Sequence, residues 1–333
     1  MAGSPDDRPA STAGRPSSAH GDHARVPTHE TRRLESQAER GPDAAELDAE
    51  EEHKATEEES INAAITHEVL RRDGTKELER PVAALAWSGL AAGLSMGLSM
   101  AAGGILHAHL PDRPWRPLVT ALGYSIGFLV VIIGSQQLYT ENTLKPIVPY
   151  MAKRTGEMLR KVVILWGVVL VTNLVGAFLF ALAAAHTDIF SPEVKHAFDE
   201  MGRRALEGSA LTIFARGIFA GWIIALMVWM IPAASGAGFL VIAVMAWLVG
   251  AAHLSHIIVG SVEVLYLAAT GGTTYVTYLT HFMLPTLLGN TLGGVALVAA
   301  LNHAQVVAGN AQEKKREEAR RKEEQKRRVV VQA

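Results

Sequence analysis

The stretch GIFAGWIIALMVWMIPAASGAGFLVIAVMAWLVGAAHLSHIIVGSV, residues 217–262, decides the fold class of this chain. It contains no Asp, Glu, Lys or Arg over 46 residues. That length is enough for two membrane passages of about 20 residues each, with a turn between them. Near its end lies His256, a titratable side chain at a depth where such groups are costly and tend to serve a function. This histidine is therefore the first candidate site residue.

Charged residues are concentrated at the two ends of the chain and are sparse in the long middle part. The first 79 residues carry 19 acidic and 10 basic side chains and the last 24 carry 5 acidic and 9 basic, whereas the 230 between carry only 9 acidic and 12 basic. A soluble core of this size would show amphipathic helices rather than long uncharged runs. We therefore predict an all-α polytopic membrane protein with two charged tails. Because there is no Cys, disulfides, thiolate nucleophiles and Cys-based metal sites are excluded.

Four segments are expected along the chain. Residues 1–60 are predicted to be a disordered acidic tail, 61–79 an amphipathic lead-in helix, 80–308 the transmembrane domain and 309–333 a charged C-terminal tail. Six spans are predicted within the domain, at about 81–107, 118–138, 162–185, 211–229, 236–269 and 285–305. The second is expected to break after its apolar run, and the fifth near 253–256. With six spans the basic loops and tails fall on one side, which predicts that both termini are cytoplasmic.

Three correspondences predict two homologous halves, about 80–187 and 208–308. GLAAG at 89–93 resembles GIFAG at 217–221, GSQQLYT at 134–140 aligns with GAAHLSH at 250–256 at an offset of 116, and TNLVGA at 172–177 resembles GNTLGG at 289–294 at an offset of 117. Since three spans per half is an odd number, the halves must be inserted in opposite directions. Inverted repeats with broken helices are typical of transporters and channels. The alignment makes Thr140 the repeat partner of His256.

Together these segments resemble the formate/nitrite transporter family over roughly residues 78–308. The residues that carry the resemblance are LYTENT at 138–143, NLVGA at 173–177, LMVWM at 226–230, His256, and LPTLLGNTLGG at 284–294. The resemblance implies an aquaporin-like channel domain of six transmembrane helices and a homopentamer with one pore per subunit in the bacterial inner membrane. It also implies passage of small monovalent weak-acid anions such as formate or nitrite. Gly221 and Gly260 stand where Asn is frequent in the family, which leaves the anion open.

His256 and Thr140 are predicted to face each other across the pore. An anion in a narrow apolar pore carries a large desolvation cost, which a positive field or a proton reduces. Imidazole can give and retake a proton near neutral pH. We therefore expect His256 to be a proton donor or relay, and Thr140 to donate a hydrogen bond to the anion or the imidazole. The alternative is a buried neutral histidine that joins two helix breaks without proton transfer.

Further candidates are polar or bulky residues within the predicted spans. Asn173 and Asn290 are expected to hold the broken loops or line the pore, although packing between helices is an alternative. Arg216 and Glu263 are expected either to form an ion pair or, in the case of Arg216, to draw anions into the outer vestibule. Glu141 is predicted to pair with Lys145 or to cap backbone amides. Pore constrictions are expected at Leu90, Leu94, Phe219 and Leu138, with plain packing equally open for each.

Other activities are disfavoured by what the sequence lacks. No enzyme, cofactor or metal site is expected, because no nucleophile has a paired base, and His253 with His256 has no further ligand at a suitable spacing. The basic C-terminal tail alternates with Glu and has no aromatic residue, which favours attraction to anionic lipid over nucleic-acid binding. Two other classes stay open: a neutral small-solute channel on the same scaffold, and a non-transporting membrane scaffold or sensor.

Overall fold

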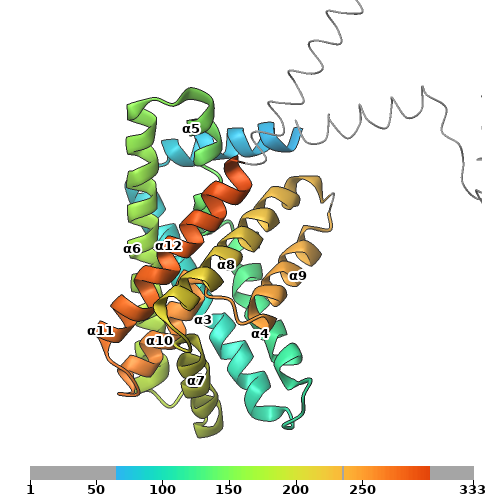
Figure 1. Cartoon of the computed structure of the whole chain (residues 1–333), viewed down its shortest axis with the longest axis vertical. Helices are drawn as coiled ribbons and strands as arrows, with labels where there is room; N and C mark the ends of the chain where they lie inside the picture. The colour runs from blue at the N-terminus through green and yellow to red at the C-terminus, as the bar shows by residue number, and fades with distance from the viewer. Residues whose placement is uncertain (1–64, 235, 301–333) are drawn as a thin grey trace, which may run out of the picture. The chain divides into compact units, whose positions relative to one another are not determined.

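The computed structural model describes residues 65–234 and 236–300, with side chains as far as residue 296. Within these ranges all regular elements are helical, and they cross one another in a bundle (Figure 1). The prediction of an all-α chain is thus confirmed for the described residues. The predicted tails at 1–60 and 309–333, and the end of the sixth predicted span at 301–305, lie outside them.

A helix over residues 65–79 comes first. The later elements are α3 (Val82–His109), α4 (Arg116–Ile133), the 3₁₀ turn η1 (Glu141–Thr143), α5 (Ile147–Lys153), α6 (Gly156–His186), α7 (Pro192–Ala205), α8 (Ala210–Met230), the 3₁₀ turn η2 (Ile231–Ala233), α9 (Gly238–Ala251), α10 (Ile257–Ala269), α11 (Tyr275–Thr277), the π-helix η3 (Tyr278–Met283), α12 (Leu284–Leu292) and the π-helix η4 (Gly293–Ala300). Residues 275–300 form one continuous helical stretch.

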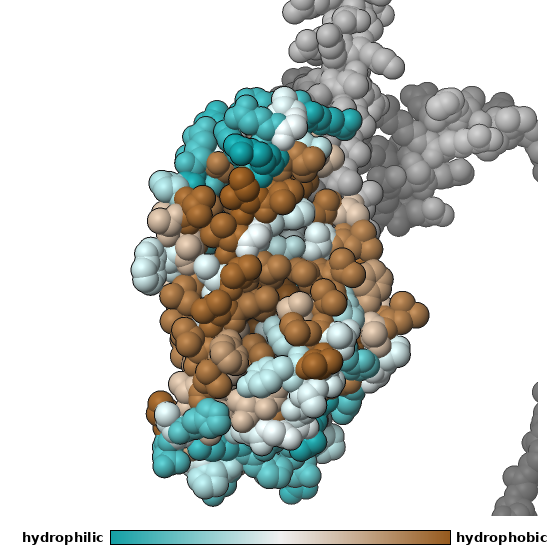
Figure 2. Space-filling view, turned by 90° about the vertical axis from the view of Figure 1, so that its left-hand side faces the viewer, coloured by the Kyte–Doolittle hydropathy of each residue, from teal (hydrophilic) through white to brown (hydrophobic). Residues whose placement is uncertain are grey.

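Within the described residues, four helical stretches are long and apolar enough to cross a membrane. They cover residues 82–109, 116–133, 156–186 and 210–233 and contain 28, 18, 31 and 24 residues. Helices α9 and α10 are apolar but shorter, with 14 and 13 residues. Many large apolar side chains point outward from these helices; Trp87 and Leu211, for example, are more than 70% exposed. Figure 2 shows a broad hydrophobic band between hydrophilic ends, which is the surface that a bilayer covers rather than water.

Local sequence explains where these helices begin and end. Thr155 accepts a hydrogen bond from the Met158 N–H at the start of α6, and Ser209 accepts one from the Thr212 N–H at the start of α8. The helical stretch that contains the sixth predicted span begins at Tyr275, ten residues before the predicted start, and the polar residues of its first turns hid this start in the sequence. Pro285 follows the π-helix η3, whose wider turn accommodates a ring that clashes in an α-helix.

The two predicted interruptions are present. Helix α4 ends at Ile133, five residues before the predicted end of the second span, and the chain resumes helical structure at η1. The fifth predicted span consists of α9 and α10, separated by residues 252–256, so its predicted break is confirmed. Each broken segment therefore places non-helical backbone inside the bundle, where protein groups must satisfy its hydrogen bonds.

Two glycines bring helices into direct backbone contact. A Cβ added at Gly93 of α3 would collide with the backbone of Asn173 in α6, and one added at Gly221 of α8 would collide with the backbone of Asn290 in α12. Small residues allow membrane helices to approach this closely. Through these two contacts Asn173 lies next to the first break and Asn290 next to the second. At Gly221, the position where the family often has Asn, a larger side chain has no room.

Candidate functional site

The two breaks have the same internal geometry. Ser135 in the first and His253 in the second are both left-handed, with φ of 52° and 50°. The N–H of the next residue, Gln136 or Leu254, donates to the carbonyl oxygen of Val131 or Val249 in each case. These equivalent residues are 118 apart, so the predicted offset of 116 is wrong by two residues. The predicted alignment pairs Gly134 with Gly250, whereas the geometry of the turn pairs Gly134 with Ala252.

The corrected register changes the partner of His256. Leu138, not Thr140, occupies the equivalent place in the first break. Leu138 is fully buried, as is His256, which is 1% exposed. The two breaks therefore differ chemically, because the apolar Leu138 side chain in the first occupies the place of the His256 imidazole in the second. The pairing of Thr140 with His256 is a contact between the breaks, rather than a repeat equivalence.

Asn173 and Asn290 hold the two breaks in place with matching hydrogen bonds. The Asn173 side chain accepts from the Tyr139 N–H at 2.9 Å and donates to the carbonyl oxygens of Gly89 and Gln137 at 2.7 and 2.8 Å. The Asn290 side chain accepts from the Ile257 N–H and donates to the carbonyl oxygens of Gly217 and Ser255, all at 2.8 Å. Both asparagines are fully buried. Each amide satisfies two backbone groups that a break leaves without helical partners, and its third bond joins the break to a helix carbonyl.

His256 and Thr140 are in direct contact at the centre of the bundle. The His256 Nε2 and Thr140 Oγ1 atoms are 2.8 Å apart, and both side chains are buried. The N–H groups of Ile258 and Val259 donate to His256 Nδ1, each at 3.3 Å, so the ring also caps the N-terminus of α10. Because Nδ1 accepts, a neutral ring carries its proton on Nε2 and donates it to the threonine hydroxyl. The Thr140 hydroxyl proton is then free to bind another acceptor.

An aromatic residue closes the other side of the imidazole. The Phe128 ring of α4 lies edge-on to the His256 ring, with centroids 5.0 Å apart, and it is fully buried. This contact excludes water from one face of the ring. Phe128 did not stand out in the sequence, because it is one apolar residue among many in its helix.

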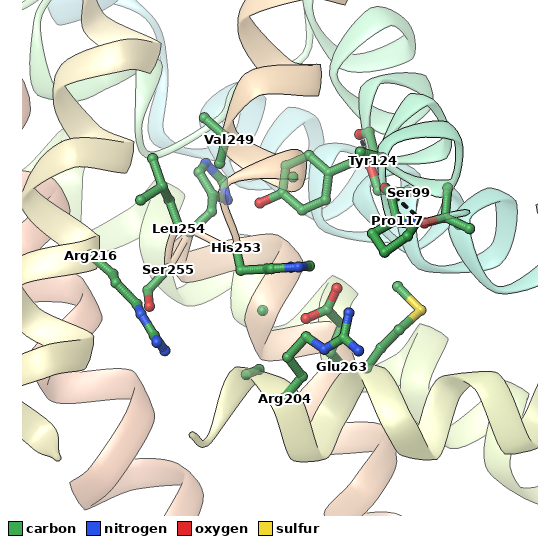
Figure 3. Close-up of a pocket in the computed structure, with 18 of the residues that line it drawn as sticks. Ser99, Pro117, Tyr124, Arg204, Arg216, Val249, His253, Leu254, Ser255 and Glu263 are labelled. Carbon is green, nitrogen blue, oxygen red and sulfur yellow. Dashed lines mark hydrogen bonds between the residues drawn. The ribbon is translucent and has the colours of Figure 1, made fainter. Parts of the chain in front are cut away.

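A cavity of about 110 Å³ includes His256 in its wall. It collects polar side chains from five helices besides the break: Ser99 of α3, Tyr124 of α4, Arg204 of α7, Arg216 of α8 and Glu263 of α10. Figure 3 shows His253, Tyr124, Arg204 and Glu263 turned toward a common space. Arg204, Tyr124 and His107 were missed by sequence reasoning, since each lies in an unremarkable helix far along the chain from His256.

The predicted ion pair between Arg216 and Glu263 is not formed. Arg216 Nη1 instead donates to the Glu207 carbonyl oxygen at 2.8 Å, and in Figure 3 the Arg216 side chain lies apart from Glu263. The reason is geometric: the loop before α8 offers a carbonyl oxygen to Arg216, and Arg204 is the arginine that lies beside Glu263 in Figure 3. Both residues do line the cavity.

The remaining candidates are distributed around the site. The prediction that Glu141 pairs with Lys145 is confirmed, with Lys145 Nζ 2.8 Å from Glu141 Oε2. Leu90 is half-buried, Leu94 is 39% exposed and Phe219 is 54% exposed against Trp222. None of these three, nor Leu138, lines the cavity. Among the residues that the structure describes, no three His, Asp or Glu side chains gather as metal ligands.

At Gly260 the space for a side chain is already filled. A Cβ there would collide with the ring of Phe282, which is buried and lines the same cavity. An Asn at this position, as is frequent in the family that the sequence resembles, is replaced here by glycine and a neighbouring aromatic ring. The cavity wall next to Gly260 is correspondingly apolar.

A helical membrane protein in which two broken helices meet at a buried polar pair, beside a polar cavity, has the architecture of a transport protein. The chain belongs to the formate/nitrite transporter family, whose sequence model matches residues 64–304. It is 43% identical over 244 residues to "Inner membrane protein YfdC" of Escherichia coli (strain K12), covering 73% of this chain and 79% of that protein. It is also 24% identical over 243 residues to "Formate-nitrite transporter 3" of Toxoplasma gondii, covering 68% of this chain and 48% of that protein.

Solved structures share the fold, among them the following two. A structure described as "Pentameric formate channel with formate bound" matches with a TM-score of 0.56 and 19% identity, over 71% of this chain and 99% of that one. A structure described as "FNT family ion channel" matches with a TM-score of 0.56 and 22% identity, over 72% of this chain and 96% of that one. At these identities the similarity establishes the fold, and the specificity must be argued from this chain's own residues.

Proposed function

We propose that this protein is a membrane channel or transporter for small monovalent weak-acid anions of the formate and nitrite class. The observation that carries the proposal is the 2.8 Å contact between His256 and Thr140, which joins the two breaks beside a polar cavity. Such a site offers hydrogen-bond donors to an anion where the surrounding bundle is apolar. Membership of the family supports the same class of cargo.

In this proposal Thr140 and His256 form an anion-binding site in the middle of the pore, here called the mid-pore station. With the ring neutral, the Thr140 hydroxyl donates to the arriving anion while His256 Nε2 donates to Thr140. For His256 to pass a proton to the anion, the ring must first gain one, and the added proton belongs on Nδ1. Two backbone N–H groups already face that atom. Proton relay by His256 therefore requires the cap on α10 to open, which couples protonation to movement of the second break.

The proposal extends to architecture and assembly. Six spans, with residues 275–300 as the last, would form two inverted halves of three, and the matching breaks and asparagines support this arrangement. We propose a homopentamer in a bacterial inner membrane with both termini cytoplasmic. One structural neighbour is described as a pentameric channel, and the E. coli relative is named as an inner membrane protein. Molar mass in detergent, measured by light scattering, tests the oligomer.

The decisive test is flux in proteoliposomes. Formate, nitrite, acetate, lactate and hydrosulfide are offered across a range of pH to the wild type, to His256→Asn and to His256→Ala. We expect weak-acid uptake by the wild type and an altered pH response in both variants. His109→Asn is the control, because His109 lies at the exposed end of α3, where its ring is hydrogen-bonded to the Ile105 carbonyl of the same helix, and it does not line the cavity. Absence of any weak-acid flux contradicts the function, and an unchanged pH response in the variants contradicts the role of His256.

A further inference from the structure

Helix α7 packs closely against α10, and this packing positions the side chain of Arg204. The rings of Phe198 and Tyr266 are 5.3 Å apart, edge to face. One turn further along, a Cβ on Gly202 would lie 2.7 Å from the Glu263 carbonyl oxygen, so the two backbones touch there. Arg204 follows Gly202 by two residues. The close contact therefore brings the Arg204 side chain to the cavity beside the Glu263 carboxyl, as Figure 3 shows.

Arg204 and Glu263 face the cavity without being joined. Within the described ranges, the side chain of neither residue has a hydrogen bond or an ion pair, although the charge of Arg204 acts on Glu263. Two other basic side chains of the cavity, those of Arg216 and His107, differ in this respect. Arg216 is bound to the Glu207 carbonyl oxygen, and the side chain of His107 is 2.8 Å from Glu200. An exposed guanidinium on α7 and a partly buried carboxyl on α10 thus line the same cavity, and neither is bound by another protein group that the structure describes.

Such a pair suits a ligand that presents an acceptor and an ionisable proton at once. An isolated carboxyl inside an apolar bundle is costly unless a partner or a proton neutralises it. A guanidinium offers N–H donors in a planar fork that matches two oxygen atoms. A small oxyacid can accept from the guanidinium through one oxygen and share one proton with the carboxyl through the other.

We propose that Arg204 and Glu263 form a two-point binding station for a small oxyacid and its proton, next to the His256 site. This inference rests on the proposed weak-acid transport and names its substrate class: acids with two oxygen atoms on one centre, such as formic, acetic or nitrous acid. One proton lies between the ligand and Glu263: the acid brings it to an ionised Glu263, or the anion meets it on a protonated Glu263, and the two complexes have the same composition. Hydrosulfide, with a single acceptor atom, cannot span both groups.

Other titratable groups share the cavity with Glu263. They come from the remaining elements that line it: His107, Tyr124, Arg204, Arg216, His253 and His256. A pH profile of the wild type therefore contains several contributions. The contribution of Glu263 is isolated by comparing the profile for an oxyacid with that for hydrosulfide, in the wild type and in the same variant.

The test uses the full chain in proteoliposomes, with formate and hydrosulfide as cargo. We expect Glu263→Met and Arg204→Met each to raise the half-saturating formate concentration about tenfold, the effect of losing one charge-assisted hydrogen bond. Glu263→Gln keeps the shape but cannot exchange a proton, so formate uptake should lose part of its pH dependence. Arg204→Lys should recover part of the affinity. Hydrosulfide uptake should stay within about twofold of wild type, since no two-point contact is lost.

Arg203→Met is the matched control, because Arg203 carries the same charge on the same helix but does not line the cavity. Elution of the intact oligomer in detergent verifies folding, and the near-isosteric Glu263→Gln carries the test if Glu263→Met fails to assemble. Formate affinity and pH profile unchanged in the Glu263 variants, or an equal loss of hydrosulfide uptake, would overturn the station. Absence of uptake by the wild type instead contradicts the transport function itself, so the two failures are distinguishable.

Discussion

Asn173 and Asn290, 117 residues apart in sequence, each tie a helix break to the neighbouring long helix by one accepted and two donated hydrogen bonds. An amide is the side chain that can do this, since it carries an acceptor and two donors on one planar group. Each asparagine thus replaces the water that a break of this kind would bind in a soluble protein. The shape of the site depends on both.

Replacing either asparagine by alanine is expected to destabilise the protein strongly. Asn173→Ala or Asn290→Ala leaves two buried backbone groups of a break without partners, each costing about 1–3 kcal/mol, and removes the bond to the neighbouring helix. We expect a large loss of intact oligomer on heating in detergent, measured by size-exclusion chromatography after a temperature series. Thr280→Ala, which removes an exposed hydroxyl bound to its own helix, should behave like the wild type. Wild-type stability in both Asn variants would contradict the supporting role.

The close helix crossings predict a sharp contrast among glycine substitutions. Gly93→Ala and Gly221→Ala place a methyl group against backbone atoms that cannot move aside, so we expect little assembled protein. Gly167→Ala is the matched control, because no atom lies within 4 Å of its Cβ position and alanine favours a helix by about 1 kcal/mol over glycine. Yield and melting temperature in detergent provide the measurement. Equal behaviour of all three variants would show that the crossings are looser than described.

Thr140 offers a test of the mid-pore station that leaves the histidine intact. Thr140→Val removes the hydroxyl and keeps the shape, whereas Thr140→Ser keeps the hydroxyl. We expect formate flux to fall about tenfold in the valine variant, from loss of one hydrogen bond, and to be largely retained in the serine variant. Initial rates in proteoliposomes at saturating formate are the readout. A serine variant as impaired as the valine variant would indicate that the methyl group, rather than the hydroxyl, matters.

The ion pair between Glu141 and Lys145, which follows the first break, predicts that substitutions at these two residues change the melting temperature non-additively. The side chains of Glu141 and Lys145 are 5% and 25% exposed, and one Glu141 oxygen, Oε1, is buried without a partner. Removing one partner leaves a largely buried charge, which costs roughly 3–5 kcal/mol. Lys145→Met should therefore lower the melting temperature more than the double variant Glu141→Gln with Lys145→Met. A double-mutant cycle of melting temperatures checks this, and strict additivity would mean that the pair contributes nothing.

Most of what sequence reasoning missed depends on contacts between distant helices. The two breaks were visible as polar residues in apolar runs, yet their alignment was two residues off because similar small residues flank both turns. The left-handed residues Ser135 and His253 set the true register, and neither is a glycine, so neither gave a signal. The sequence did not point to Arg204 as a site residue for another reason, because this arginine lies in a polar helix that resembles an ordinary surface linker.

By itself the sequence determined the membrane class, the positions of the breaks and the identity of the buried polar residues. Those follow from the cost of placing charge or unpaired backbone in hydrocarbon, which constrains every residue locally. Tertiary structure alone decided that Leu138 matches His256, that Arg216 leaves Glu263 unpaired and that Arg204 reaches the same cavity. These outcomes depend on how closely helices far apart in the chain approach, and contacts such as Gly202 against Glu263 set that distance through packing rather than through any local pattern.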